Sequence, residues 1–405
     1  MHRAESRSGT PFAAARALGG IPEGTERRPS KTDTLRPTYG FDDVSLAPGI
    51  ETCDPSEVDT SAELGGLRLE IPILASSMDA VVDSRFAGAM ARLGGLAFLN
   101  LEGVQTRHDD PDAVLERIAS APDEAVQALL AEAYEPPIRL ELVARRIEEM
   151  HAAGARAAVA ATPAAARQLG PFCAEHGAEL FLVQSQVSSA RHLAAGYEPL
   201  ELDEFVRFMP LPVAVGNTTS FEAAYLLMEQ GIAAIFVGVG PGAACTTRDV
   251  LGIGVPQVSA IGDVAAARDT YFDRTGRYVP VVADGGMRRG GEVAKAIAAG
   301  ADAVMLGSPL ARAAEAPGQG VNWGMAAPSP VLPRGTRIKV GTIGSLEQIL
   351  FGPATVTDGS QNLMGALRQS MAALGARTLR EMQAVEIVYA PSVVTEGKSW
   401  QLKGR

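Results

Sequence analysis

Short apolar runs alternate with helical patterns along this chain, and the alternation limits the folds that it can form. From Tyr39 onward the runs are separated by patterns such as Leu140–Ala153, Phe221–Gln230 and Gly291–Ala299. Runs that are apolar on both faces and joined by helices predict a parallel sheet covered by helices. The runs that we interpret as strands are Ile71–Ala75, Leu96–Asn100, Ala157–Ala161, Glu179–Gln184, Leu211–Gly216, Ala233–Val239, Val279–Ala283 and Ala303–Leu306.

Eight strands is the number that closes a (β/α)8 TIM barrel, which typically takes about 250 residues. The span from Ile71 to Arg334 is close to that length. We therefore predict an α/β protein built on a (β/α)8 barrel, with a doubly wound open sheet as the alternative. The predicted domains are a flexible N-terminal tail at residues 1–34, a catalytic barrel at 35–390 and a C-terminal tail at 391–405.

Composition argues against several classes of function. The chain has 405 residues, a formal net charge of −11 and three widely spaced cysteines, Cys53, Cys173 and Cys245. The acidic surface argues against binding of nucleic acid or of an anionic membrane. No apolar run is long enough to cross a bilayer. An odd number of distant cysteines disfavours a disulfide framework, so we predict a cytoplasmic protein.

Polar or glycine-rich segments follow six of the eight predicted strands. In a parallel barrel the carboxyl ends of all strands lie on one face, where active sites are built. We therefore expect these segments to meet in space. They are residues 76–79, 184–186, 216–218, the turn that contains Cys245, residues 284–286 and residues 307–308.

Cys245 lies in a glycine-rich turn, residues 237–248, between an apolar run and a predicted helix. Glycines let backbone N–H groups approach a ligand closely. A helix N-terminus favours the thiolate, which is the nucleophilic form of cysteine. We therefore predict that Cys245 is a reactive nucleophile. The hydroxyls of Thr246 and Thr247 are candidates for positioning a water, and helix capping is their alternative role.

Two further loops predict a nucleotide site. Asp284-Gly285-Gly286 and Gly307-Ser308 follow the seventh and eighth predicted strands, where barrel loops frequently bind phosphate. Glycine N–H groups and a hydroxyl can donate to phosphate oxygens, and a carboxylate can accept from both hydroxyls of a ribose. A nucleoside monophosphate is the ligand that these loops predict. None of the five histidines ends a predicted strand, which disfavours a Cys–His hydrolase.

Five motifs resemble, in their order, the inosine monophosphate dehydrogenase and guanosine monophosphate reductase family. They are residues 39–48, 76–79, 237–247, 283–286 and 304–308, and the similarity extends from Thr38 to Met382. The resemblance implies a (β/α)8 barrel assembled as a homotetramer or a higher homo-oligomer. It also implies a purine nucleoside monophosphate as substrate and NAD or NADP as cofactor.

The resemblance implies that Cys245 attacks the purine C2, that hydride passes to NAD, and that water hydrolyses the covalent thioimidate. Thr247 matches the catalytic threonine beside the reacting centre. The residues implied to bind the nucleotide are Ser76, Met78, Asn217, Asp284, Gly286, Gly307, Ser308, Gly324 and Met325. The cofactor positions are Gln184 and Ser185, and the carbonyls that resemble a potassium site are those of Gly240, Gly242 and Cys245.

Four departures from the family pattern bear on the reaction. Dehydrogenases of the family commonly carry a pair of regulatory nucleotide-binding modules where this chain has only Gly103–Arg139. Gln184 stands where an aspartate is expected near the nicotinamide ribose, and a mobile flap with an Arg-Tyr pair is missing. Arg334 falls where both subfamilies usually place a glutamate.

The chain therefore resembles a divergent branch that is usually grouped with the dehydrogenases. By that analogy we expect oxidation of inosine monophosphate to xanthosine monophosphate, a step of guanine nucleotide biosynthesis. Reduction of guanosine monophosphate with NADPH is the second hypothesis, because the flap and the modules are missing. Purine nucleotide binding without turnover is the third, because of Arg334 and Gln184.

Overall fold

The computed structural model of the protein describes residues 35–324 and 337–391. Contacts divide the chain into a unit at Met1–Pro37, of which residues 35–37 are described, and a unit at Thr38–Arg405. The second unit holds every helix and strand discussed below. The predicted N-terminal tail at 1–34 lies outside the described residues, as does the predicted C-terminal tail beyond Pro391.

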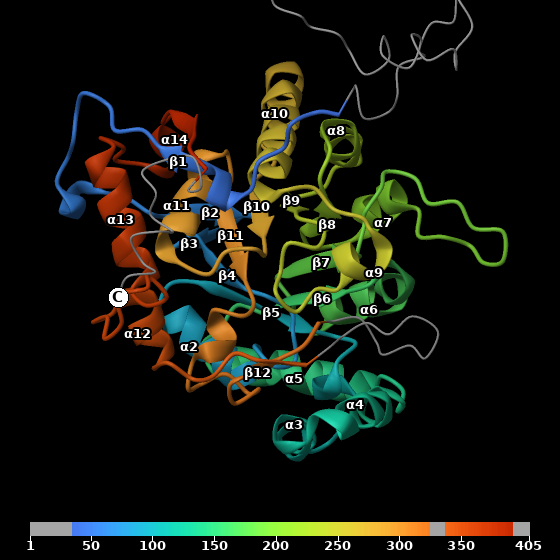
Figure 1. Ribbon diagram of the computed structural model, residues 1–405. Helices are drawn as coiled ribbons and strands as arrows, with labels where there is room; N and C mark the ends of the chain where they lie inside the picture. Colours follow the sequence, from blue (N-terminus) through green and yellow to red (C-terminus); the bar gives the residue numbers. More distant parts are fainter. Residues whose placement is uncertain (1–34, 325–336, 392–405) are drawn as a thin grey trace, which may run out of the picture. The chain divides into compact units, whose positions relative to one another are not determined.

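Eight parallel strands close into a barrel (Figure 1). They are β4 (Ile73–Ala75), β5 (Leu96–Asn100), β6 (Ala158–Ala161), β7 (Leu180–Gln184), β8 (Val213–Thr218), β9 (Ala234–Val237), β10 (Val281–Asp284) and β11 (Ala303–Leu306). Consecutive strands pair in parallel, and the pairing of β11 with β4 closes the ring. The predicted TIM barrel is confirmed, because each predicted run overlaps one barrel strand, and the open-sheet alternative is wrong.

Helices lie between successive barrel strands or follow the last one, and many of them cover the outside of the barrel (Figure 1). They are α2 (Ser84–Arg92), α3 (Pro111–Ser120), α4 (Val126–Tyr134), α5 (Leu140–Ala152), α6 (Pro163–Glu175), α7 (Leu202–Phe208), α8 (Phe221–Glu229), α9 (Thr247–Leu251), α10 (Gln257–Thr275), α11 (Gly290–Ala298), α12 (Leu346–Phe351), α13 (Leu363–Ala373) and α14 (Leu379–Met382). Local sequence fixes where several of them begin. Asp83 accepts from the Phe86 amide at the start of α2, and Ser220 accepts from the Ala223 amide at the start of α8.

Three pairs of short antiparallel strands complete the described part. They are β1 (Val44–Leu46) with β14 (Ile387–Tyr389), β2 (Ala62–Leu64) with β3 (Leu67–Leu69), and β12 (Val321–Asn322) with β13 (Ile338–Lys339). Among the described residues, the helices lack the combination of length and apolar composition that crossing a membrane requires.

The apolar residues form an inner core and an outer core. Side chains that point into the barrel, among them Leu74, Phe98 and Phe236, pack together, with the two phenyl rings edge to face at 5.7 Å. The next residues along the same strands, such as Ile73 and Leu99, pack outward against the helices. This alternation of facing is the period-two geometry of a strand. Leu64 of the β2–β3 hairpin joins the inner core beside the first residues of several strands. The hairpin therefore covers the amino ends of the barrel and leaves the carboxyl ends available for a site.

Helix α11 offers a direct test of the packing against α13. A Cβ added at Gly290 would lie 2.3 Å from the Cβ of Ala366, whereas nothing lies within 4 Å of a Cβ added at Gly291. We expect Gly290→Ala to lower the free energy of unfolding by about 1–3 kcal/mol, because the two helices must separate. Gly291→Ala is the matched control, and it should leave stability unchanged or raise it by up to about 1 kcal/mol. Urea denaturation measures both, and equal effects would contradict the close approach of the helices.

Candidate active site

Side chains from four strand ends meet at the carboxyl face of the barrel. The Asp284 carboxylate, at the end of β10, accepts hydrogen bonds from Asn217 Nδ2 at 2.7 Å and Gln184 Nε2 at 3.1 Å. The Gln184 Oε1 in turn accepts from Ser77 Oγ at 2.7 Å. The structure thus brings the predicted residues Asn217, Gln184 and Asp284 into one hydrogen-bonded cluster. It adds Ser77, to which sequence reasoning gave no role of its own.

Asp284 has an unusual protonation equilibrium for a carboxyl group. Burial raises its pKa to about 6, although the hydrogen bonds from Asn217 and Gln184 act in the opposite direction. Both donors are neutral amides, so within the described part of the chain no cation pairs with this carboxylate. A carboxyl group with such a shifted pKa at the mouth of a barrel is typical of a functional site.

Cys245 lies in the loop that follows β9, and its side chain is exposed. Its Sγ is 3.1 Å from the Thr247 Oγ1, within the sulfur–oxygen distance of a hydrogen bond. Thr246 occupies the N-cap position of α9, but its side chain makes no capping bond. The Thr247 hydroxyl therefore faces the thiol, as expected if the threonine acts beside the reacting centre.

Gln186 also contacts this pair, and sequence reasoning assigned it no role. Its Nε2 donates to the Thr247 Oγ1 at 2.5 Å. The two residues are 61 positions apart in the chain, on the segments that follow β7 and β9. The only signal in the sequence is that Gln186 follows a predicted strand, which does not identify Thr247 as its partner.

The two predicted phosphate loops lie close to the cysteine loop and to residues 76–78. Gly285 and Gly286 have φ values of +78° and +83°, which favour glycine. A Cβ added at Gly286 would lie 3.0 Å from the Pro241 Cβ. A Cβ added at Gly307 would lie 2.9 Å from the Met78 Sδ and 3.8 Å from the Ser76 Cβ.

Other predicted nucleotide contacts border the same region. The Ser308 Oγ accepts from the Asn322 Nδ2 at 3.1 Å. A Cβ added at Gly324 would lie 3.5 Å from the Ala244 carbonyl oxygen, so Gly324 is next to the cysteine loop. Met325 and Arg334 lie outside the described residues.

The two predicted cofactor positions are already engaged within the protein. Gln184 uses its amide nitrogen and its amide oxygen in the Asp284 cluster. The Ser185 Oγ is 2.9 Å from the Ser188 Oγ, and the Ser185 amide donates to the Gly216 carbonyl at 2.7 Å. Gln184 would have to leave these partners to hold a nicotinamide ribose. The geometry therefore fits Gln184 better as a support for Asp284 than as a cofactor ligand.

The three carbonyls predicted to bind potassium belong to one short loop. The Gly242 carbonyl accepts from the Cys245 amide at 3.0 Å. Arg248 packs against Gly240, and its guanidinium donates to the Val239 carbonyl at 3.3 Å. A carbonyl oxygen with one partner keeps a second lone pair, but the nearby guanidinium opposes a cation. Among the described residues, His, Cys, Asp and Glu form no group of three or more that could hold a metal ion.

A second carboxylate, the fully buried Asp79, is held by the segment between β5 and β6. Its Oδ2 accepts from the Tyr134 hydroxyl at 2.5 Å and from the Val104 amide at 3.3 Å. The Tyr134 hydroxyl also accepts from the Trp323 Nε1 at 2.9 Å. Burial raises the pKa of Asp79 to about 6, although the Tyr134 hydroxyl lowers it. Tyr134 thus connects two chain segments that carry the predicted contacts Met78 and Gly324.

The segment Gly103–Arg139 folds into α3, α4 and short 3-10 helices, where dehydrogenases of the resembled family commonly carry regulatory modules. In this structure it forms hydrogen bonds to the chain segments on either side of residues 325–336. The buried Arg337 guanidinium donates to the Ile118 carbonyl at 2.6 Å and pairs with Asp123 at 2.5 Å. Trp323 and Arg337, on either side of residues 325–336, are therefore both bonded to this helical insert.

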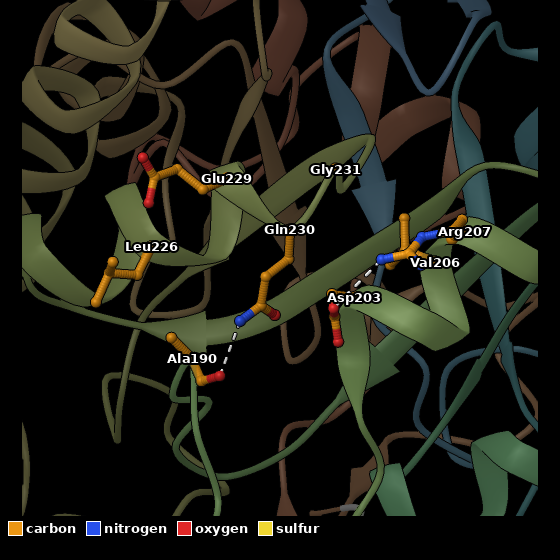
Figure 2. A pocket seen from close by; sticks show the side chains of 8 residues that line it. All are labelled: Ala190, Asp203, Val206, Arg207, Leu226, Glu229, Gln230 and Gly231. Atoms are coloured by element: carbon orange, nitrogen blue, oxygen red, sulfur yellow. Dashed lines mark hydrogen bonds and ion pairs between the residues drawn. The ribbon is translucent and has the colours of Figure 1, made fainter.

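An open groove of about 690 Å³ lies elsewhere, along α7 and α8 (Figure 2). It is lined by Ala190, Asp203, Val206, Arg207, Leu226, Glu229, Gln230 and Gly231. Asp203 pairs with Arg207 at 3.5 Å, and the Gln230 Nε2 donates to the Ala190 carbonyl at 2.8 Å. None of the predicted site residues lines this groove, so we place the candidate site at the strand ends.

Tyr134→Phe tests the role of the helical insert. Loss of the hydroxyl removes a donor from buried Asp79 and an acceptor from Trp323, so we expect the free energy of unfolding at pH 8 to fall by about 1–3 kcal/mol. The loss should be smaller at pH 5. The folded-state pKa of Asp79 is already raised, and the substitution raises it further, so the added penalty applies only where Asp79 is ionised.

Urea denaturation at pH 5 and pH 8 measures this difference. Tyr389→Phe is the matched control, because Tyr389 is 66% exposed, and it should have little effect at either pH. A Tyr134→Phe protein as stable as the native one at pH 8 would show that the Tyr134 hydroxyl does not stabilise the ionised Asp79.

Comparison with known proteins gives the following relationships. Residues 38–325 match the family model described as the IMP dehydrogenase / GMP reductase domain. An uncharacterized oxidoreductase from Mycolicibacterium smegmatis is 42% identical over 361 residues, covering 87% of this chain and 96% of the relative. An inosine-5'-monophosphate dehydrogenase from Methanocaldococcus jannaschii is 28% identical, and the match covers 87% of this chain and 93% of the relative. An IMP dehydrogenase/GMP reductase-like protein from Corynebacterium glutamicum, known from a crystal structure, is 35% identical in sequence. Its structure matches this one with a TM-score of 0.83, over 91% of this chain and 97% of that protein.

Proposed function

The chain belongs to the IMP dehydrogenase / GMP reductase family of oxidoreductases, and from this premise we propose that it oxidises inosine monophosphate to xanthosine monophosphate with NAD. The observation that carries the proposal is the exposed Cys245 thiol 3.1 Å from the Thr247 hydroxyl, in a loop that adjoins Gly286. The direction of the reaction is supported by the relative from Methanocaldococcus jannaschii, whose name is inosine-5'-monophosphate dehydrogenase.

We assign substrate binding to the residues gathered around the cysteine loop. Asp284 would accept from the ribose hydroxyls, since a carboxylate can accept from two hydroxyls at once. Gly286, Gly307 and Ser308 would donate to the phosphate, as glycine-rich loops after the last two strands of a barrel frequently do. Ser76, Met78, Asn217, Gly324 and Met325 would complete the nucleotide contacts.

In the first step the Cys245 thiolate would attack the purine C2 and form a C–S bond. The C2 hydrogen would leave with its electron pair as a hydride, and NAD would supply the acceptor for it. The product on the protein is a covalent thioimidate at C2. Thr247 would contribute a hydroxyl beside the sulfur during this step.

In the second step water would add to C2 and the C–S bond would break. The sulfur departs as a thiolate, the oxygen of water stays on C2, and xanthosine monophosphate forms. Overall, inosine monophosphate, NAD⁺ and water give xanthosine monophosphate, NADH and a proton. Thr247 is our candidate for positioning the water, and no step depends on potassium at Gly240, Gly242 and Cys245.

The proposal includes the setting in which this chemistry occurs. We propose a cytoplasmic homotetramer or a higher homo-oligomer that acts in guanine nucleotide biosynthesis, with neither nucleic acid nor membrane as a partner. Gln184 and Ser185 stay our proposed neighbours of the cofactor, with Gln184 acting mainly on Asp284. NADP is the alternative hydride acceptor.

The reaction is tested by the near-ultraviolet absorbance of reduced nicotinamide. We expect absorbance to rise when the native protein is mixed with inosine monophosphate and NAD, and we expect no rise with Cys245→Ala, because the nucleophile is absent. Cys53→Ala is the matched control and should keep the activity. A fall in absorbance with guanosine monophosphate and NADPH would show the reductase instead. Absence of any change, with nucleotide binding intact, would show a binding protein.

Asp284→Asn tests the ribose contact through its pH dependence. Binding of inosine monophosphate to the Cys245→Ala protein, measured by calorimetry, should weaken as the pH falls from 8 to 5. The reason is that Asp284, whose pKa burial raises to about 6, gains a proton and loses acceptor strength. At pH 8 we expect the added Asp284→Asn substitution to weaken binding about tenfold, the scale of a hydrogen bond to a charged group.

At pH 5 the two proteins should differ little, and the pH dependence that persists in Asp284→Asn reports the phosphate of the ligand. Equal affinities of the two proteins at pH 8 would exclude Asp284 as the ribose acceptor.

A further inference from the structure

We infer that Gln186 is a positioning residue that orients the Thr247 hydroxyl toward the Cys245 sulfur. The inference rests on the proposed role of Cys245 as the nucleophile. It adds a third member, from the end of β7, to the pair formed by the cysteine and the threonine. Neither a sequence motif nor the family resemblance assigned a role to this side chain.

The Thr247 oxygen makes two contacts. Gln186 Nε2 donates to it at 2.5 Å, and the Cys245 Sγ lies 3.1 Å from it. A hydroxyl has one proton to donate and two lone pairs that accept. The amide N–H occupies one lone pair, which leaves the hydroxyl proton free to point at the sulfur. A thiolate sulfur has no proton to donate, so toward the nucleophilic form of Cys245 the threonine is the donor.

This direction matters for the chemistry of the sulfur. A hydrogen bond donated to an anion is stronger than one between neutral groups, so the threonine would hold the attacking sulfur more firmly than a neutral contact could. The bond also fixes the position of a sulfur that is otherwise on an exposed loop. An amide neither takes up nor releases a proton near neutral pH, so Gln186 orients the threonine and is not itself a base.

The segment that carries Gln186 is anchored through the backbone of the preceding residue, Ser185. The Ser185 amide donates to the Gly216 carbonyl at 2.7 Å, and the Asn217 amide donates to the Ser185 carbonyl at 3.1 Å. Gln184, immediately before Ser185, is hydrogen-bonded to Ser77 and to Asp284. A side chain that extends from an anchored segment holds its target more precisely than one on a free loop. The end of β7 thus contacts Asp284 through Gln184, and the segment after it contacts Thr247, next to the nucleophile, through Gln186.

The inference is tested by the alkylation rate of Cys245 in the free protein at one pH, which needs neither substrate nor cofactor. Peptide mass analysis separates Cys245 from Cys53 and Cys173, and the rate at Cys53 is an internal control. Gln186→Met keeps the length of the side chain but cannot donate. We expect it to slow alkylation of Cys245 by about three- to tenfold, the effect of one hydrogen bond. Val187→Ala, at the next exposed position, is the matched control and should leave the rate unchanged.

A double-mutant cycle separates positioning from a general structural effect. In a Thr247→Val background, Gln186→Met should have no further effect, because the residue through which Gln186 acts is gone. Gln186→Glu should slow alkylation at least as much as Gln186→Met, since a carboxylate accepts the threonine proton. The same loss from Gln186→Met with and without Thr247, or no loss in either protein, would overturn the inference.

Kinetics with inosine monophosphate and NAD add a second readout. We expect Gln186→Met to lower kcat by a similar factor and to change KM little, because the nucleotide contacts stay in place. If the native protein forms no NADH, the proposed reaction fails while the alkylation cycle still decides the role of Gln186. If NADH forms and the alkylation cycle shows no coupling to Thr247, the reaction stands and the inference about Gln186 fails.

Discussion

Closure of the eight-stranded sheet is the constraint on which the rest of the structure depends. Parallel pairing of β11 with β4 brings the last strand back to the first, so the chain segments that follow the strands must share one rim. Leu64 and the inward side chains fill the barrel and its amino end, which leaves the carboxyl rim as the face for chemistry. Met78 and Gly307, far apart in the sequence, become neighbours for this reason.

The polar part of the rim is organised by neutral donors around two carboxylates, the buried Asp79 and the partly buried Asp284. Asp284 is held by two amides, and Asp79 by a phenol and a backbone amide. Burial therefore raises the pKa of both carboxyl groups to about 6. Gln184 supports Asp284 without adding a charge, because its amide donates to the carboxylate at 3.1 Å. An aspartate at this position would instead place a second negative charge beside Asp284.

Sequence reasoning predicted the barrel well because strand identity depends on local runs of apolar residues, which the sequence displays directly. It also predicted Asp284 and Asn217 as members of one site, because barrel topology alone brings strand ends together. It missed Gln186, Ser77 and Tyr134. Their roles depend on contacts between side chains 61, 107 and 55 residues apart, and on which way each side chain points. Neither periodicity nor motif order specifies such directions. Met325 and Arg334, to which the sequence analysis gave roles, lie outside the described residues.

The central claim is that Cys245 becomes covalently attached to the purine during oxidation. The most direct measurement is mass analysis of the Cys245 peptide after rapid acid quenching of the protein during turnover. Our account predicts a purine nucleotide attached to this peptide only when inosine monophosphate and NAD are both present. NADH formation at full rate without any adduct, and undiminished in Cys245→Ala, would contradict it.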